Sequence, residues 1–565
     1  MRFPDSVRSA SVNAVFLSIA LLPACGCGVS SPARAQGVKS RTGPFTVLGV
    51  DESLVRSVLN VDRNNPVASD ANPGTTALPF RTISAALALA DTLVREGMGT
   101  KVAIQPGVYR EALNIPRADP GVVQPLVIEG TGSTIVSGAD VWTGWQQKGS
   151  SGMWTHAWTY QWGNAPYPPG WAGNVYLAPI VTRREMVFVN GSPLTEVLPG
   201  QGLYPGSFSV SETAHTITVM VDPSIDFNAA TVEVAVRSPL LLAQGRTNLV
   251  VRGIAFQYAS TPLPGGAVTI SDSAKVLVEN CSFLWNNWNG LDVLTSQDVT
   301  IRGVHAENDG GSGMGGYEIL RLLVDSSDTS SNNWRGAMGG FTGWDVGGSK
   351  FELIHNGLFR AYTSMNNQAR GLWLDTDDMN VSIESSRFEN NLGDAIFFEA
   401  NQGPLSVTGS RMCGSTQGAG VAGSASSNVL LTRNVVCGNA QGQFLITGDT
   451  DRNVTNWETG EVLDLRAENW TICGDSMQAN NWNQPSFNTP DWPWFLQSLD
   501  SNWNLWDIPK GASGFVLGGE NLSFNGWRGA TNQDSRSLAK VGGTFPVTLA
   551  SRFPQNCGTE RAAAP

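Results

Sequence analysis

The chain has 565 residues, which is long enough for one very large domain or for several ordinary ones. Its 48 Asp and Glu outnumber its 36 Lys and Arg, so the net charge at pH 7 is −12. A protein that binds nucleic acid needs a basic face, and this acidic balance argues against nucleic acid as a partner. The four histidines lie far apart, without metal-ligand spacing, so we expect no metal and no cofactor.

The first 35 residues are typical of a secretory signal peptide. Arg2 and Arg8 precede the apolar run "AVFLSIALLPAC", and Ala33 and Ala35 have the small-residue spacing of a cleavage site. We therefore expect cleavage after Ala35 and a secreted or periplasmic protein. A lipoprotein box ending at Cys25 is the alternative, but the proline in "LPAC" fits it poorly. No later apolar run reaches the ~20 residues of a membrane helix, so no membrane span is expected.

Residues 36–139 are predicted to form an N-terminal cap and the first turns of a larger structure. Within them, "PFRTISAALALADTLVREG" is the one clear helical pattern, and Gly97 ends it. Its apolar residues fall at helical spacing at Ile83, Leu87, Ala90 and Val94. A single amphipathic helix needs something to cover, so we interpret it as a capping helix.

Residues 140–235 interrupt the pattern that follows them. They contain Trp-rich loops and the segments "RREMVFVNGSPL" and "TAHTITVMVDP". A strand, an Asn-Gly turn and a second strand predict a small β-sheet domain inserted at this point.

Residues 236–477 repeat one design of an alternating strand, a polar corner, a second short strand and a turn. Examples are "LVVRGIAFQYAS", "VLVENCSFLWNN" and "VSIESSRFENN". The copies start 23 to 27 residues apart, except for one interval of 59 that holds two copies and a long excursion. A repeat of this length made of strands predicts a parallel β-helix, because no single rung can bury its own apolar face. Leucine-rich repeats need regularly spaced Leu and Asn that are absent here.

Turn residues and cysteines recur with the same period. Asparagine tolerates the left-handed turn geometry, and its amide bonds well to the amide of the next rung. Pairs of asparagines mark the turns at 286–287, 332–333, 366–367 and 390–391. Cys413 and Cys437 lie 24 residues apart, and stacked strands ~4.8 Å apart are within disulfide reach. A buried pair of thiols is the alternative, and the one we favour.

Residues 478–565 contain "DWPWFLQSLDSNWNLWDI". We interpret this Trp-rich stretch as a cap over the open end of the coil, followed by a tail, in preference to a sugar-binding surface.

Alignment of two neighbouring repeats places two carboxylates at the same position. "NNQARGLWLDT" from residue 366 aligns without a gap to "NNLGDAIFFEA" from residue 390, which pairs Asp375 with Glu399. Their side chains should leave the same face about 5 Å apart, while Leu374 and Phe398 point inward. The same spacing continues the column to two small residues, Gly423 and Thr447. Arg370 falls opposite Asp394, as in a structural ion pair.

Such a pair suits acid–base chemistry at a glycosidic bond. Two close carboxylates repel, so the pKa of one rises and that of the other falls, which gives a proton donor beside an ionised group. A separation near 5 Å fits a retaining glycosidase, because inverting enzymes need roughly 6.5 to 9.5 Å to admit a water. A solvated acidic corner and a calcium site made by Asp375, Asp377 and Asp378 are the alternatives.

The segment "RGLWLDTDDMNVSIESSRFENNLGDAIFFEANQGPLSV" resembles the active-site rungs of right-handed parallel β-helix glycoside hydrolases, most closely glycoside hydrolase family 120, the β-xylosidases. The family's nucleophile is the Asp of "WLD", and its acid/base is the Glu of "FFE" before "GP". The resemblance thus implies Asp375 and Glu399 in these roles. "RREMVFVNG" and the opening "SDANPGTTALPFRTISAALALA" are also similar to the family. After "WLD" this chain has "TDDMN", where the β-xylosidases have a bulkier stretch that contains an aromatic residue. The resemblance therefore does not identify the sugar.

Substrate contacts are expected around the pair. The Gly-rich excursion "NNWRGAMGGFTGWDVGG" is suited to fold over a sugar, with Trp334 or Trp344 as a stacking platform and Arg335 as a hydroxyl donor. Simple packing is the alternative for each. Three further candidates lie beside the carboxylates in sequence: Trp373, Asp377 and Asp378.

Together these observations predict an all-β protein: a right-handed parallel β-helix with a capping helix and an inserted small β-sheet domain. We expect an exported retaining glycoside hydrolase acting on a neutral, plant-type or other oligo- or polysaccharide, with its oligomeric state open. A polysaccharide lyase or epimerase would need a base and usually calcium, and the scarcity of clustered Lys argues against it. A noncatalytic carbohydrate-binding β-helix would have no reason to stack Asp on Glu.

Overall fold

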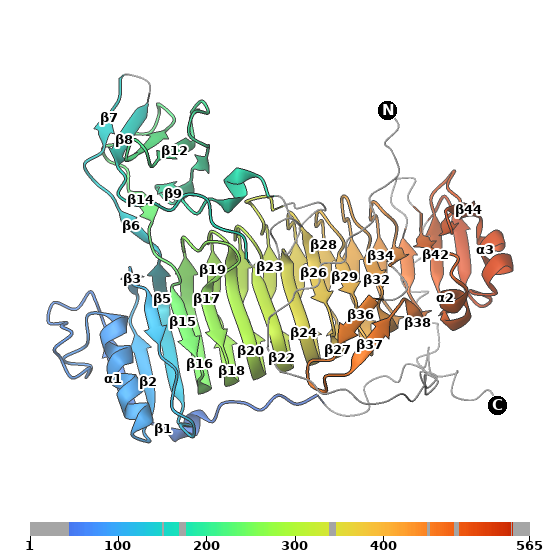
Figure 1. Cartoon of the computed structure of the whole chain (residues 1–565), viewed down its shortest axis with the longest axis horizontal. Coiled ribbons are helices and arrows are strands. Elements are labelled where there is room, and N and C mark those ends of the chain that lie inside the picture. The colour runs from blue at the N-terminus through green and yellow to red at the C-terminus, as the bar shows by residue number, and fades with distance from the viewer. Residues whose placement is uncertain are drawn as a thin grey trace, which may run out of the picture.

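The computed structural model describes residues 45–149, 152–168, 177–337, 346–448, 452–478, 485–543 and 545. The expected signal peptide and Trp344 lie outside these ranges. Parallel strands coil along one axis over most of the chain (Figure 1), which confirms the predicted right-handed parallel β-helix. None of the helices in the described ranges has the length and apolar character to cross a membrane.

Each complete rung has three faces. The first face contains β2 (Gly99–Ile104), β5 (Leu126–Ser137), β16 (Thr247–Gln257), β18 (Ala274–Glu279), β20 (Asn289–Arg302), β22 (Met314–Asp325), β24 (Gly347–Arg360), β27 (Met379–Glu384), β30 (Leu405–Thr408), β33 (Ser427–Thr432), β38 (Glu468–Cys473) and β41 (Asp500–Asn502). The long strands β5, β16, β20, β22 and β24 each run through a corner and so belong to two faces.

The second face follows the first after a polar corner. It contains β3 (Gly107–Tyr109), the ends of β5 and β16, β19 (Ser282–Leu284), β21 (His305–Glu307), β23 (Asp328–Ser330), β25 (Thr363–Met365), β28 (Arg387–Glu389), β31 (Arg411–Cys413), β34 (Val435–Cys437), β39 (Ser476–Gln478), β42 (Leu505–Ile508) and β45 (Leu538–Val541).

The third face closes each rung. It contains β4 (Leu113–Ile115), β15 (Leu241–Gln244), β17 (Gly266–Ser271), the beginnings of β20, β22 and β24, β26 (Arg370–Asp375), β29 (Ile396–Glu399), β32 (Val421–Ser424), β35 (Phe444–Thr447), β40 (Phe487–Thr489) and β43 (Phe515–Leu517). Alternate residues point inward, and one continuous apolar core runs the length of the coil, from Leu59 to Trp527.

A helix covers the N-terminal end of the coil. Helix α1 (Ile83–Arg95) lies beside β1 (Val55–Val61) and β2 in Figure 1, and the Thr82 side chain caps it by accepting a hydrogen bond from the Ala85 amide. The 3-10 helix η1 (Glu52–Leu54) precedes β1. The buried face of α1 consists of Ile83, Ala86, Leu87, Ala90 and Val94. Helix α1 therefore shields the apolar interior of the first rungs from water.

The segment between β5 and β15 forms two small sheets outside the coil, seen at the upper left of Figure 1. One contains β6 (Ala139–Val141), β9 (Val187–Val189), β10 (Ser192–Pro193) and β14 (Val232–Ala235); the other contains β7 (Gln146–Gln147), β8 (Met153–Ala157), β11 (Thr195–Glu196), β12 (Ser207–Ser211) and β13 (Thr216–Met220). They share a separate apolar core rich in tryptophan. The 3-10 helix η2 (Pro179–Thr182) lies between β8 and β9.

The coil extends further toward the C-terminus than the sequence indicated. Strands β40 to β43 and β45 continue the parallel pairing beyond residue 478, so this region is not only a cap. Two short helices, α2 (Pro493–Ser498) and α3 (Phe524–Thr531), and β44 (Glu520–Leu522) add cover. The aromatic character of this region has a physical role, because Trp506 and Trp527 fill the core there.

Asparagine ladders hold the corners between the second and third faces. The Asn332 backbone N–H and side-chain amide both donate to Asn367 Oδ1 at 3.0 Å, and Asn367 donates to Asn391 Oδ1 in the same way. Residues beside the ladder adopt the left-handed conformation at Asn333, Asn366 and Asn390. The predicted structural role of the asparagine pairs is confirmed.

An aspartate occupies one ladder position in each of three corners: Asp309, Asp378 and Asp475. Each is fully buried, and its Oδ1 accepts a hydrogen bond from a backbone amide of the preceding rung. Within the described residues, Oδ2 of each has no hydrogen-bond partner. Burial raises the pKa of all three carboxyls.

Cys413 and Cys437 form a disulfide between neighbouring rungs, with their Cα atoms 4.5 Å apart. Our preference for a pair of thiols was therefore wrong. The two residues are direct partners in the parallel register of β31 and β34, which brings them within bonding range.

Candidate active site

The third face carries a column of carboxylates on its outer side. Register places Glu352 of β24 beside Asp375 of β26, and Asp375 beside Glu399 of β29. Neighbouring strands lie ~4.8 Å apart, so both steps of this column bring acidic side chains close together. Leu374 and Phe398, the inward neighbours, are 0% exposed. Alternation along these strands therefore forces Asp375 and Glu399 outward.

The next member of the column is Ser424, not Gly423. The rung from Glu399 to Ser424 is one residue longer than the period we had used, and Gly423 pairs instead with inward-facing Phe398. A Cβ at Gly423 would lie 2.4 Å from the indole of Trp470, so glycine is needed there for core packing. Thr447 does follow in the column, as expected.

A lysine lies against the central acid. Lys350 Nζ is 3.1 Å from Asp375 Oδ2 and 3.7 Å from Glu352 Oε2. Thr376 also donates a hydrogen bond from its hydroxyl to Asp375 Oδ1 at 2.9 Å. An ammonium group and a hydroxyl donor thus hold the two oxygens of Asp375 in a fixed position.

An arginine reaches the pair from outside the repeat. Arg452 begins a hairpin of β36 (Arg452–Thr455) and β37 (Val462–Leu465), shown in orange in Figure 1. Its Nη1 is 2.6 Å from Glu399 Oε1. We call residues 452–465 the arm.

Glu399 has the environment of a proton donor. Burial raises its pKa above the ordinary value, and the adjacent Asp375 charge adds to the rise, whereas Arg452 and Lys350 oppose it. The net direction is upward, so this carboxyl holds its proton to higher pH than a free glutamate does. Asp375 and Glu399 thus differ in environment although they are neighbours in the column.

Trp373 forms part of the floor of this face. It is 2% exposed, and its ring lies 5.7 Å from that of Phe397. Lys350 and Arg370 lie over its indole at 4.5 and 4.7 Å from the ring centroid. Arg370 also pairs with Asp394 at 3.2 Å, which is the predicted ion pair. Trp373 thus supports two cations and is covered by them.

Asp377 and Asp378 turn away from the column. Both are 0% exposed. Asp377 accepts hydrogen bonds from Gln402 and from the Trp457 amide, and Asp378 accepts one from the Ile354 amide at 2.7 Å. Their oxygens stabilise the corner after β26, so we leave both out of the proposed site.

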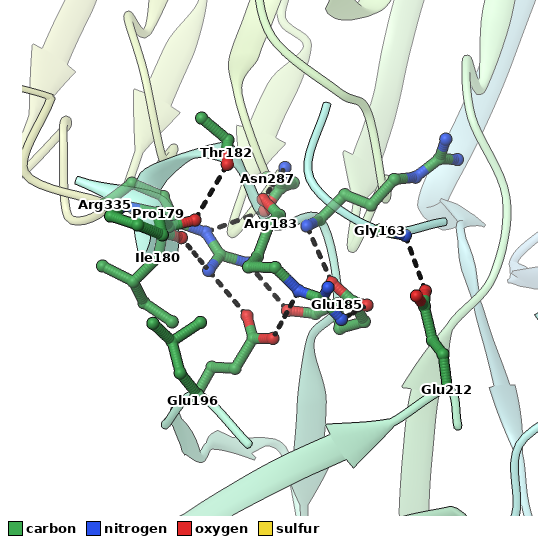
Figure 2. A network of polar contacts seen from close by, with 12 residues as sticks. Gly163, Pro179, Ile180, Thr182, Arg183, Glu185, Glu196, Glu212, Asn287 and Arg335 are labelled. Atoms are coloured by element: carbon green, nitrogen blue, oxygen red, sulfur yellow. Dashed lines mark hydrogen bonds and ion pairs between the residues drawn. The ribbon is translucent and has the colours of Figure 1, made fainter. Parts of the chain in front are cut away.

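Trp334 and Arg335 lie where the inserted sheets meet the coil. Figure 2 shows Arg335 within a buried network, where it pairs with Glu196 at 2.8 Å and donates to the Glu185 carbonyl and to Asn287. Burial raises the pKa of Glu196 to about 7 in spite of Arg335. The guanidinium lies 4.5 Å from the Trp334 ring centroid. Their contacts therefore join the inserted sheets to the coil.

No group of three or more His, Cys, Asp or Glu within the described ranges is arranged to hold a metal ion. The three aspartates considered for calcium diverge, because Asp375 faces outward while Asp377 and Asp378 are buried in the corner.

Sequence reasoning missed Lys350, Glu352 and Arg452. Lys350 and Glu352 follow the long excursion, so their rung is 35 residues from the preceding one and a period near 24 does not find them. The alternation in "SKFEL" was an available signal, since Lys350 and Glu352 fall on one face of a strand. Arg452 belongs to a segment that lacks the repeat, so its position relative to Glu399 cannot be obtained by aligning rungs.

Comparison with known proteins agrees with the fold. Residues 266–457 match the family model of the right-handed β-helix region. A solved structure of XylC in complex with xylose has a TM-score of 0.58 at 13% identity, covering 86% of each chain. A protein described as a glycoside hydrolase has a TM-score of 0.49 at 11% identity, with 88% of this chain and 98% of that chain covered.

The A-module of the mannuronan C-5 epimerase AlgE4 from Azotobacter vinelandii has a TM-score of 0.43 at 10% identity, with 81% and 96% covered. None of the curated protein sequences is significantly similar to this chain. At such low identity, the likeness to XylC shows a shared fold.

Proposed function

We propose that this protein is an exported retaining glycoside hydrolase with Asp375 as nucleophile and Glu399 as acid/base. The observation that carries the proposal is the direct register of Asp375 and Glu399 on the outer face, with a cation against the first and a raised pKa on the second. Strand spacing of ~4.8 Å fits the short carboxylate separation of retaining enzymes.

In the first step an oxygen of Asp375 attacks the anomeric carbon. A C–O ester bond forms as the glycosidic C–O bond breaks, and the Glu399 proton passes to the leaving-group oxygen. Lys350 remains beside Glu352 when Asp375 loses its charge to the ester, so the ammonium keeps an anionic neighbour. The Arg452 guanidinium stabilises the Glu399 carboxylate that the proton transfer leaves behind.

In the second step Glu399 acts as base. It takes a proton from water, and the water oxygen attacks the anomeric carbon as the bond to Asp375 breaks. Asp375 leaves as a carboxylate and regains its ion pair with Lys350, and Glu399 is again protonated. Two inversions give net retention of anomeric configuration.

The charge of the face favours a neutral sugar. Among the described side chains of the column and its direct ion pairs, the acids Glu352, Asp375 and Glu399 face the cations Lys350 and Arg452. This balance leaves no surplus positive charge to bind the carboxylate group of a uronate. Since the XylC structure contains xylose, aryl xylosides are the first substrates to try.

The test separates the two carboxylates. Asp375→Asn should abolish turnover of every substrate. Glu399→Gln should still form the glycosyl-enzyme from aryl glycosides with good leaving groups, and added azide should rescue it as a glycosyl azide of retained configuration. An inverted product from the wild type, or an active Asp375→Asn enzyme, would refute the assignment.

A lyase or epimerase is the second candidate, and one observation favours it. Lys350 lies beside the carboxylates, where a base for proton abstraction from a uronate would be placed. An unsaturated product absorbing in the ultraviolet, or epimerised uronate, would identify this activity. Absence of any turnover together with glycan binding would indicate a noncatalytic binding protein.

A further inference from the structure

The arm follows the same three rungs as the carboxylates. Its first residue, Arg452, meets Glu399 of one rung. Its tip reaches back along the coil, where the Trp457 amide donates to Asp377 Oδ2 at 3.0 Å, two residues after Asp375. The arm therefore runs beside the whole acidic column.

Apolar packing seats the base of the arm. Val454 and Leu465, on opposite strands of the hairpin, are 5% and 6% exposed and pack against Ala400, the residue after Glu399. Few apolar side chains of the arm are buried in this way, so its position depends on polar contacts at the tip.

A buried histidine makes those contacts. His355, three residues after Glu352, is 0% exposed. Its Nδ1 contacts Glu458 Oε2 on the arm, and its Nε2 lies 3.1 Å from Asp377 Oδ2 and 3.0 Å from the Asp377 carbonyl. Both ring nitrogens face oxygen acceptors, which an imidazolium satisfies because it donates from both. The ring of Trp457 packs beside it at 5.0 Å.

We propose that the arm is a positioning element of the active site: the Glu458–His355–Asp377 latch holds it on the coil, and Arg452 holds the Glu399 carboxyl in place. The inference rests on the proposed function of Glu399. Arg452 is a positioning residue, because it acts through Glu399. The latch acts indirectly, because it fixes the position of Arg452.

The kinetic test is a double-mutant cycle. Arg452→Met and Glu458→Gln should each lower kcat by about 10- to 100-fold on substrates whose leaving group needs protonation, since small displacements of a catalytic group cost this much. Aryl glycosides with good leaving groups should lose less. The double variant should be no worse than Arg452→Met, because the latch works through that arginine.

Controls on the same segment separate positioning from folding. Arg466→Met removes an exposed arginine that pairs with Glu468 just beyond the arm, and Glu461→Gln removes an exposed carboxylate from its turn. Both should leave kcat unchanged. Arg452→Lys should recover part of the activity lost in Arg452→Met, because it keeps the charge while losing the planar fork. Additive losses in the cycle would overturn the proposal.

A second readout needs no turnover. The infrared band of the protonated Glu399 carboxyl, assigned by difference against Glu399→Gln, should persist to higher pH in both Arg452→Met and Glu458→Gln, because Arg452 lowers the pKa of this group. An unchanged titration in Glu458→Gln would refute the latch whatever the enzyme does. A shifted titration in a protein that cleaves no glycoside would leave the arm's role standing and refute only the proposed hydrolysis.

Discussion

Replacing Asp475 by asparagine should stabilise the protein above neutral pH and have little effect in acid. Asp475 is fully buried and takes a ladder position between two asparagines: its Oδ1 accepts from the Asn434 amide, and its own amide donates to Asn504 Oδ1. At the same position those asparagines donate from Nδ2 to a carbonyl of the preceding rung. A protonated Asp475 also carries one donor, and Leu431 is the residue in register with the two acceptors, Val407 and Ile472.

The magnitude follows from the shifted pKa. Burial raises the pKa of Asp475 from 3.8 to about 7. Because the folded pKa exceeds the unfolded one, the folded state binds more protons between these values, and stability falls as pH rises through this window. Each pH unit costs about 1.4 kcal/mol, so the full loss is about 4 kcal/mol. Asparagine does not titrate and avoids this loss.

Urea unfolding of wild type and Asp475→Asn at pH values from 4 to 8 measures the effect. The free energies of unfolding should coincide near pH 4 and diverge by about 4 kcal/mol above pH 7, with the variant more stable. Asp464→Asn, which removes the same charge from an exposed strand, should run parallel to the wild type. A difference that does not change with pH would show that Asp475 is ionised when buried and that the ladder interpretation is wrong.

Three further outcomes are expected. Leu374→Asp should unfold or aggregate the protein, since it places a charge in the core. Asp375→Asn should give a normal circular dichroism spectrum. Equal behaviour of the two variants would refute the assignment of Leu374 as inward-facing and Asp375 as outward-facing. Lys350→Met removes the ammonium group that contacts Asp375, so kcat should fall by about tenfold, since a hydrogen bond to a charged group contributes about 1.5 kcal/mol; an unchanged kcat would contradict this role. Chelation by EDTA should leave activity intact, because the proposed steps use only protein side chains and water; loss in EDTA restored by calcium would favour the lyase.

Periodicity determined most of what sequence alone established. A repeat of about two dozen residues specifies a coil, because each rung can bury its apolar residues only against its neighbours. Within the regular rungs the same period gives the register, so the alignment of Asp375 with Glu399 and of Leu374 with Phe398 follows directly from counting. The rung that ends at Ser424 is one residue longer than the period, so the prediction of Gly423 in the column was wrong.

Tertiary structure decided everything that lies outside the period. Lys350 joins the column only after a 35-residue rung, and Arg452 meets Glu399 from a hairpin 53 residues later in the chain. Alternation along a strand does not extend into the corner, where left-handed residues at Thr376 and Asp377 turn the following carboxylates inward. Strand pairing in the coil joins residues that are one repeat apart in the chain, and the sequence reveals the length of that repeat. The packing of excursions depends on which surfaces they meet in space, and no local pattern records that.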